Sequence, residues 1–292
     1  MIPAPFEYRR ASSVKEAVEL LGSEEDAKAI AGGHSLLPLM RLRLARPSTL
    51  VDIARIGDLS YVRKDGKEVA IGALTRHHDI ANDGTLAKEC PIVAWTAGQI
   101  GDPQVRHVGT IGGSVAHADP ASDLPTVLLA LGATFVVQGP KKERRVAAKD
   151  FFVDYFTTAV GPDEILVSVS FPKYTGWGAN YQKLNRTAQA WAIVGAAATV
   201  RMDGGAIAEA RIGLTNMGPS PVRASSVEAA LVGASTREAI AAAAGRNERL
   251  RLLAAWENGG DDPSHDRLSV RVTAVPADSG FGRTVGGGNQ IV

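Results

Sequence analysis

The chain has 292 residues, enough for one large domain or two compact ones, and its 32 Lys and Arg nearly balance its 31 Asp and Glu. This balance argues against nucleic acid as the main partner, because phosphate binding requires a clustered basic excess. The single cysteine, Cys90, excludes an internal disulfide, and it excludes an iron–sulfur cluster or cysteine-rich zinc site held by this chain alone. No apolar run reaches the roughly 20 residues of a membrane helix, and no signal peptide is evident, so we expect a cytoplasmic protein.

The N-terminal part predicts a helix, a strand, a glycine-containing segment, a second helix and a second strand. Ser13 and Glu16 have the spacing of a capping box at the start of the helix "VKEAVELLG". The apolar "KAI" then predicts a short strand that leads into "AGGHS", residues 31–35. A helical pattern follows with Ser35 as its expected N-cap, and "TLVDI", residues 49–53, predicts the next strand.

The middle of the chain alternates between strand and helix patterns. "EVAIGALT" predicts a strand, and "RHHDIAND" predicts a helix that carries residues 76–78 on a solvated face. "LAKECPIVAWTAGQI" predicts one helix with Pro91 near its start or at a kink.

A second glycine pair, in "TIGGSVAHADPASDLP" at residues 110–125, repeats the first arrangement and predicts a loop between a strand and a helix. Glycines remove the Cβ atoms that block close approach of a ligand, and consecutive N–H groups in such a turn form an anion-binding nest. One glycine pair is most often a plain turn. Two similar loops predict a site that holds the two phosphates of a pyrophosphate from both sides.

The remaining patterns divide the chain into two domains. "ATFVVQG", "RRVAAKDFF" and "EILVSVSFP" predict strands, and "KKERR" predicts a solvated hairpin turn. The segment 173–180 is rich in glycine and aromatic residues and predicts the boundary. We therefore expect a first domain at 1–175, with subdomains at about 1–54 and 55–175, and a second at 176–292. The second has a hairpin turn at 203–205 and becomes irregular from about Asn247.

Several common sites are excluded by their missing motifs. The sequence contains no G-x-G-x-x-G, no Walker A pattern and no nucleophile elbow. The spacing of His107, His117 and Asp119 matches no common metal-ligand pattern, so no metal site is expected. Asp123 lies at a predicted helix start, and two interpretations stay open: a residue that favours the helix dipole, or a carboxylate that accepts from ribose or ribityl hydroxyls.

The motifs "AGGHSLLPLMRLRLARPSTLVDI", "TIGGSVAHADPASDLP" and "NYQKLNRTAQAWAIVGAAATV" resemble the flavoprotein (medium) subunits of the molybdenum hydroxylases over roughly residues 1–235. The likeness is greatest to the aerobic carbon monoxide dehydrogenase branch and more distant to the xanthine dehydrogenase branch. It implies an α+β fold of the vanillyl-alcohol-oxidase type, with two subdomains that hold FAD and a smaller C-terminal α+β domain. It also implies no catalytic side chain and the following FAD-binding residues: Ala31, Gly32, Gly33, His34, Ser35, Thr110, Ile111, Gly112, Gly113, Ser114, Asp123, Tyr181 and Lys183.

The resemblance further implies an assembly with a molybdopterin-binding large subunit and a small subunit that carries [2Fe–2S] clusters, in a dimer of heterotrimers. Electrons would pass from those clusters through FAD to an external acceptor. Two alternatives stay open. One is a stand-alone flavin oxidoreductase of the same fold, for which His34 is the candidate for covalent flavin attachment. The other is a scaffold subunit that has lost FAD.

Overall fold

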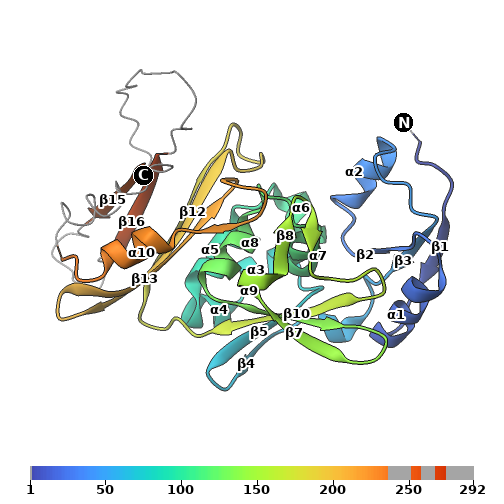
Figure 1. Cartoon of the computed structure of the whole chain (residues 1–292), viewed down its shortest axis with the longest axis horizontal. Coiled ribbons are helices and arrows are strands. Elements are labelled where there is room, and N and C mark those ends of the chain that lie inside the picture. Colours follow the sequence, from blue (N-terminus) through green and yellow to red (C-terminus); the bar gives the residue numbers. More distant parts are fainter. Residues whose placement is uncertain (1, 236–250, 258–266, 274–292) are drawn as a thin grey trace.

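The computed structural model describes residues 2–235, 251–257 and 267–273, and three sheets follow one another along its long axis (Figure 1). The N-terminal sheet is parallel, with the order β1-β3-β2. Its elements and the neighbouring helices are β1 (Glu7–Arg10), α1 (Val14–Ser23), β2 (Lys28–Ile30), α2 (Leu36–Arg41) and β3 (Thr49–Asp52). The serine half of the predicted capping box is confirmed, because the Ser13 hydroxyl accepts from the Glu16 N–H at 3.2 Å. The Glu16 carboxylate accepts from the Ser12 N–H at 2.7 Å instead of from Ser13.

The second sheet is antiparallel, has five strands and underlies a layer of short helices (Figure 1). Its order is β4 (Val62–Asp65), β5 (Glu68–Gly72), β10 (Ile165–Pro172), β6 (Thr134–Gln138) and β7 (Glu143–Ala147). The helices are η1 (Gly57–Leu59), α3 (His77–Ala81), α4 (Gly84–Glu89), α5 (Pro91–Gly98), α6 (Pro103–Val108), α7 (Ile111–His117) and α8 (Asp123–Ala130). Within the described part of the chain, none is long and apolar enough to cross a membrane.

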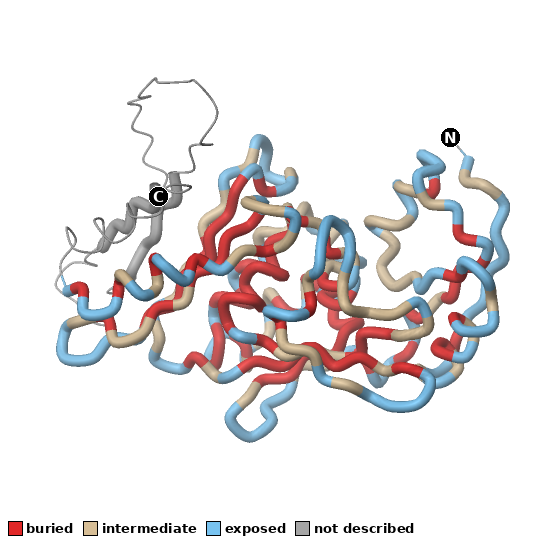
Figure 2. Tube along the Cα trace, in the orientation of Figure 1, coloured by how far each residue is buried: buried red, intermediate tan, exposed pale blue. Residues whose placement is uncertain are grey.

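The main core lies between this sheet and its helices (Figure 2). Both faces of β10 are buried. Val169 and Phe171 pack into the helical layer, whereas Ile165 and Val167 pack against the α1 side. Two separate cores therefore meet across β10, and the N-terminal sheet is held to the middle of the molecule by apolar contact.

Two predicted elements are broken into pieces. The helix expected around Pro91 is two helices, α4 and α5, which meet at Cys90, and Pro91 is the first residue of the second. The strand expected over residues 144–152 ends at Ala147 and continues as the helical turn α9 (Ala148–Phe151). Successive strand residues would point Phe151 and Phe152 to opposite faces. The turn instead places both rings against Phe135, at centroid distances of 4.3 and 5.6 Å.

A short hairpin follows, β8 (Phe152–Asp154) and β9 (Thr157–Thr158), and the chain then enters the third sheet. That sheet is antiparallel and contains β11 (Gly178–Leu184), β12 (Val194–Asp203), β13 (Ala206–Thr215) and β14 (Val222–Arg223). The predicted turn at 203–205 is confirmed as the link between β12 and β13. Beyond it come α10 (Ser225–Leu231) and the paired strands β15 (Arg251–Glu257) and β16 (Arg267–Thr273). The rest of the tail predicted to be irregular lies outside the described residues.

The third sheet is covered on both faces. Ala196, Ala198 and Val200 of β12 pack towards α10, whereas Ala197 belongs to the main core. On the α8 side the approach is close, because a Cβ added at Gly213 of β13 would lie 2.7 Å from the Thr126 carbonyl oxygen of α8. Small side chains in β12 and β13 therefore allow one sheet to lie between two helices.

Candidate functional site

A cleft of about 830 Å³ lies between the N-terminal sheet and the helical layer. Its walls are the segment after β2, the region of α6 and α7, the start of α8, the β8–β9 hairpin and the segment that joins β11 to β12. This volume falls within the range of small-molecule and cofactor sites in proteins.

The first glycine segment, residues 31–35, lines the cleft just after β2. Gly33 has φ +75°, which favours glycine, and a Cβ added at Gly32 would lie 2.4 Å from the Val108 carbonyl oxygen. Among the described residues, no N–H group of residues 32–35 has a protein acceptor. Both glycines are therefore required by the backbone, and the segment presents unpaired donors beside the cleft, as an anion-binding turn does.

The second glycine pair differs from the prediction. Residues 103–108 form α6 rather than a strand, and Gly112 and Gly113 lie in the first turn of α7 rather than in a loop. The N–H groups of residues 111–114 donate to the carbonyl oxygens of Thr75, Ala73 and Thr110 and to the Thr110 hydroxyl, at 2.8–3.1 Å. The prediction of a second anion-binding nest was therefore wrong, because the N–H groups that would form it already donate to acceptors within the protein.

The role of Gly112 is instead a close approach between backbones. A Cβ added there would lie 2.6 Å from the Ala73 carbonyl oxygen, so only glycine lets α7 meet the chain after β5. That chain runs beside residues 109–112, and the His77 N–H donates to the Gly109 carbonyl at 3.0 Å. Since Gly32 also lies close to Val108 and Gly109, the first glycine segment packs against the residues just before the second, and both segments belong to one wall of the cleft.

His77 is buried in this wall, so the prediction that residues 76–78 lie on a solvated face was wrong at its centre. Only 4 % of His77 is exposed, and its ring lies close enough to Gly109 that an added Cβ would be 3.3 Å from Nε2. Burial, with smaller contributions from Arg106 and His34, lowers the pKa of His77 to about 4. The imidazole is therefore neutral at pH 7, and its Nδ1 has no partner among the described residues.

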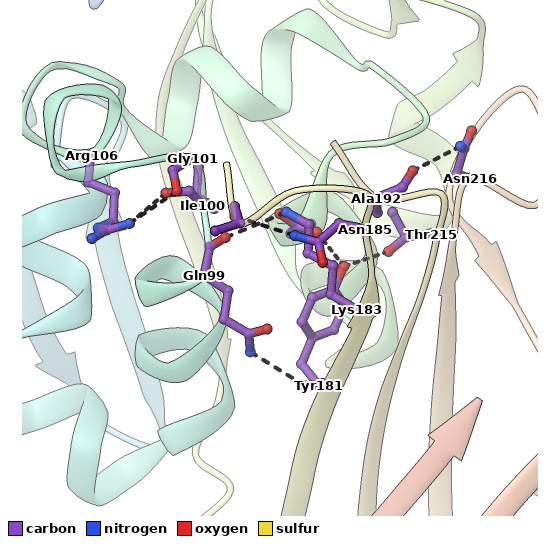
Figure 3. A network of polar contacts seen from close by, with 12 residues as sticks. Gln99, Ile100, Gly101, Arg106, Tyr181, Lys183, Asn185, Ala192, Thr215 and Asn216 are labelled. Carbon is purple, nitrogen blue, oxygen red and sulfur yellow. Dashed lines mark hydrogen bonds and ion pairs between the residues drawn. The ribbon is translucent and has the colours of Figure 1, made fainter. Parts of the chain in front are cut away.

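Asp123, the first residue of α8, is the centre of a buried polar network with Lys183 and Tyr181. Figure 3 shows Lys183, Tyr181 and Thr215 of this network. One carboxylate oxygen lies 2.8 Å from the Lys183 ammonium, and the other accepts from the Tyr181 hydroxyl at 2.5 Å. Asp123 and Lys183 are only 5 % and 4 % exposed at their side chains, yet both line the cleft. Burial raises the pKa of Asp123, and the ion pair with Lys183 and the bond from Tyr181 oppose that shift.

Nearly all the residues predicted for the site lie along this cleft. The lining includes Ala31, Gly32, Gly33, His34, Ser35, Thr110, Gly112, Gly113, Ser114, Asp123 and Lys183. Ile111 and Tyr181 are fully buried and do not line it. The cleft therefore brings together three distant parts of the sequence, and two of the predicted residues are buried away from its lining.

Some lining residues were not anticipated. Phe156, from the β8–β9 hairpin, lies with its ring centroid 5.1 Å from that of His117, and Trp191 lies between β11 and β12 with 56 % of its surface exposed. A tryptophan in the otherwise polar segment "NRTAQAW" was the available signal for the second of these.

Comparisons with known proteins agree with this geometry. Residues 4–174 match the family described as the FAD binding domain in molybdopterin dehydrogenase, and residues 179–254 match the carbon monoxide dehydrogenase flavoprotein C-terminal domain. The carbon monoxide dehydrogenase medium chain of Hydrogenophaga pseudoflava is 43 % identical over 249 residues, which cover 84 % of this chain and 86 % of the relative. The glyceraldehyde dehydrogenase medium chain of Sulfolobus acidocaldarius is 37 % identical, with coverage of 80 % and 83 %.

A solved structure extends the likeness to the fold. It is carbon monoxide dehydrogenase from Hydrogenophaga pseudoflava that lacks the Mo-pyranopterin moiety of the molybdenum cofactor. It superposes with a TM-score of 0.82 at 45 % identity, over 84 % of this chain and 86 % of that one. The chain therefore belongs to the FAD-binding subunits of the molybdopterin dehydrogenases, a family of oxidoreductases that includes the medium chains of carbon monoxide dehydrogenase.

Proposed function

We propose that this chain is the FAD-carrying electron-transfer subunit of a molybdenum-containing hydroxylase or dehydrogenase, most like the medium subunit of aerobic carbon monoxide dehydrogenase. Electrons would pass from [2Fe–2S] clusters on a partner chain through FAD to an external acceptor. The observation that carries the proposal is the first glycine segment, whose unpaired N–H groups face a cofactor-sized cleft in a chain of this family. Bound FAD supplies the capacity to accept and pass on electrons, and the protein supplies position and electrostatics.

The residues present fit a dinucleotide with a pyrophosphate. Residues 31–35 offer the unpaired donors, and the absence of a Cβ at Gly32 leaves that backbone open. We propose that the second segment contributes the opposite wall through Thr110, Gly112, Gly113 and Ser114, with Ile111 as a buried support. Two glycine segments would then hold one pyrophosphate, although only the first provides a nest.

The other end of the cleft fits hydroxyl groups. We propose that Asp123 accepts from ribose or ribityl hydroxyls of FAD, because each of its carboxylate oxygens keeps a free lone pair after bonding Lys183 or Tyr181. Lys183 would lie near the flavin ring, since its ammonium lines the same cleft.

We further propose a vanillyl-alcohol-oxidase-type arrangement of two subdomains, at about 1–54 and 55–175, with FAD between them and a C-terminal domain at 176–292. The cleft lies where the first two would meet. The cytoplasmic location expected from the sequence stays a prediction.

The cysteine content of this chain bears on which partners would carry the iron–sulfur clusters. Its single cysteine is buried in the main core, and burial raises the pKa of that thiol to about 12, so thiolate ligands for clusters must come from another chain. We propose a [2Fe–2S] small subunit and a molybdopterin-binding large subunit, assembled as a dimer of heterotrimers. The molybdenum subunit would select the substrate.

Replacement of Gly32 with alanine tests the proposal. The new Cβ would meet the Val108 carbonyl oxygen at 2.4 Å and the Gly109 Cα at 3.1 Å, so the first glycine segment must move away from residues 108–109. Overpacking of this kind costs about 1–3 kcal/mol. If FAD binding has to restore the displaced backbone, the affinity for FAD should fall about 10- to 100-fold. The measurement is the visible spectrum of the purified protein, followed by identification of the released flavin and titration of the flavin-free protein with FAD.

Gly84→Ala is the matched control. Gly84 lies in α4, and a Cβ added there meets nothing within 4 Å, so FAD affinity should be unchanged. Tight binding of FAD by a folded Gly32→Ala protein would contradict the role of the first segment. Wild-type protein that is colourless and takes up no FAD would favour the scaffold alternative, and flavin that stays attached after denaturation would favour the stand-alone enzyme.

A further inference from the structure

Tyr181 is buried behind Asp123, which lines the cleft, and its hydroxyl points towards Thr215 (Figure 3). Its side chain is 1 % exposed, and its hydroxyl lies 2.5 Å from Asp123 Oδ1 and 3.1 Å from Thr215 Oγ1. A Cβ added at Gly195 of the neighbouring strand β12 would be 2.4 Å from that hydroxyl, so a larger residue there would displace the Tyr181 side chain. Gly195 and Thr215 are partners in the β12–β13 register, and both lie beside the Tyr181 hydroxyl.

The direction of these hydrogen bonds is fixed by chemistry. An ionised carboxylate only accepts, so the Tyr181 hydroxyl donates its single proton to Asp123. Thr215 must then donate to Tyr181. The resulting chain, Thr215 to Tyr181 to Asp123, ends on one carboxylate oxygen, while Lys183 holds the other. Charge-assisted bonds of this kind are about twice as strong as neutral ones, so the carboxylate is held in one rotamer.

The backbone of Tyr181 is anchored as well. Its carbonyl oxygen faces α5 and lies 3.4 Å from both Gln99 Nε2 and Trp95 Nε1. The residue is therefore fixed to α5 by its backbone and to α8 by its hydroxyl, although it belongs to β11 in the third sheet. It does not line the cleft, so its effect on a ligand must pass through Asp123.

We propose that Tyr181 is a positioning residue for FAD, whose hydrogen bond fixes the Asp123 carboxylate in the orientation that meets hydroxyl groups of the cofactor. The proposal rests on the function proposed above, in which Asp123 is the residue that contacts FAD. It assigns Tyr181, Thr215 and Gly195 a shared role behind the site rather than in contact with the flavin.

The pH dependence of FAD binding distinguishes a positioning role of Tyr181 from a role in packing alone. The titratable groups that face Asp123 are Lys183 and Tyr181 on β11. Two groups that do not titrate lie beside them: the Thr215 hydroxyl on β13, next to Tyr181, and the carbonyl oxygen of Gln99, just after α5, next to Lys183. Loss of the Tyr181 hydroxyl removes one of the two contacts that lower the pKa of Asp123, so that pKa rises. The protonated carboxyl group is a weaker acceptor of hydrogen bonds from hydroxyl groups than the carboxylate is. In the variant, the affinity for FAD should therefore begin to fall at a higher pH than in the wild type.

The experiment compares Tyr181→Phe with Tyr174→Phe. Tyr174 is equally buried and its hydroxyl donates to the Leu131 carbonyl at 2.9 Å, away from the cleft, so both variants lose one buried hydrogen bond. FAD dissociation constants are measured by titration of the flavin-free proteins between pH 5 and pH 8. Tyr181→Phe should bind FAD about tenfold more weakly, as expected for a bond to a charged group, and Tyr174→Phe should bind as the wild type does.

A double-variant cycle with Asp123→Asn completes the test. If Tyr181 acts through Asp123, adding Tyr181→Phe to Asp123→Asn should weaken FAD binding no further. Equal affinities and pH profiles for Tyr181→Phe and Tyr174→Phe would overturn the proposal, as would fully additive effects in the cycle. In both cases the wild type still binds FAD, so the proposed function would stand; wild-type protein that fails to bind FAD would overturn both.

Discussion

Replacement of Lys183 with methionine is expected to lower the free energy of unfolding of the flavin-free protein by about 3–5 kcal/mol. This is the usual cost of removing one partner of a buried ion pair, because the other charge stays buried and unpaired. Methionine is similar in length but carries no charge, so the Asp123 carboxylate would stay buried with only the Tyr181 hydroxyl as its partner. Urea denaturation of the two proteins, followed by the tryptophan fluorescence, measures the difference.

Two further variants make the interpretation specific. Removing the second charge as well, in Lys183→Met with Asp123→Asn, should recover most of the lost stability, since the penalty comes from the unpaired carboxylate. Lys15→Met breaks an exposed pair with Glu19 and should change the free energy of unfolding by less than about 1 kcal/mol. A Lys183→Met protein as stable as Lys15→Met would show that the buried pair contributes nothing beyond a surface pair.

The second large effect is expected from His77 at low pH. Its pKa is about 4 in the folded protein, below the ordinary 6.5, so the unfolded chain takes up a proton first as the pH falls. Stability from this residue is fully present above about pH 6.5 and is lost as the pH falls towards 4. At about 1.4 kcal/mol per pH unit, the loss is about 3 kcal/mol.

His77→Leu isolates that contribution from the other groups that titrate in the same range. The free energies of unfolding of wild type and variant are measured at pH 7 and at pH 4, and their difference should change by about 3 kcal/mol in favour of the variant at the lower pH. A difference that stays constant with pH would mean that His77 is solvated or finds a partner in solution.

The features that the sequence predicted correctly are those fixed by neighbouring residues. A serine three residues before a glutamate capped α1, and Asp203, Gly204 and Gly205 made the β12–β13 turn. The first glycine segment also followed its predicted strand, because a short apolar run and a glycine pair are local signals.

The failures arise from contacts that are distant in sequence. Glycine is needed at position 112 because Ala73 lies against it, and nothing near residue 112 reveals that neighbour. The burial of His77 likewise depends on Gly109, 32 positions away by residue number. The family resemblance implied that Asp123 and Lys183 are site residues, but the ion pair between them, and the hydrogen bond from the buried Tyr181 to Asp123, could be found only from the fold.

The close approach of β13 to α8 has a consequence for how the molecule unfolds. Every residue of α8 is buried, and part of that burial is supplied by the sheet that follows residue 178. A chain cut after residue 174 would leave the face of α8 around Thr126 in water, and an isolated C-terminal sheet would lose the helix against which Gly213 lies. We therefore expect the two family segments to unfold together. A C-terminal segment taken from a relative should pack against α8 only if it carries glycine at the position of Gly213.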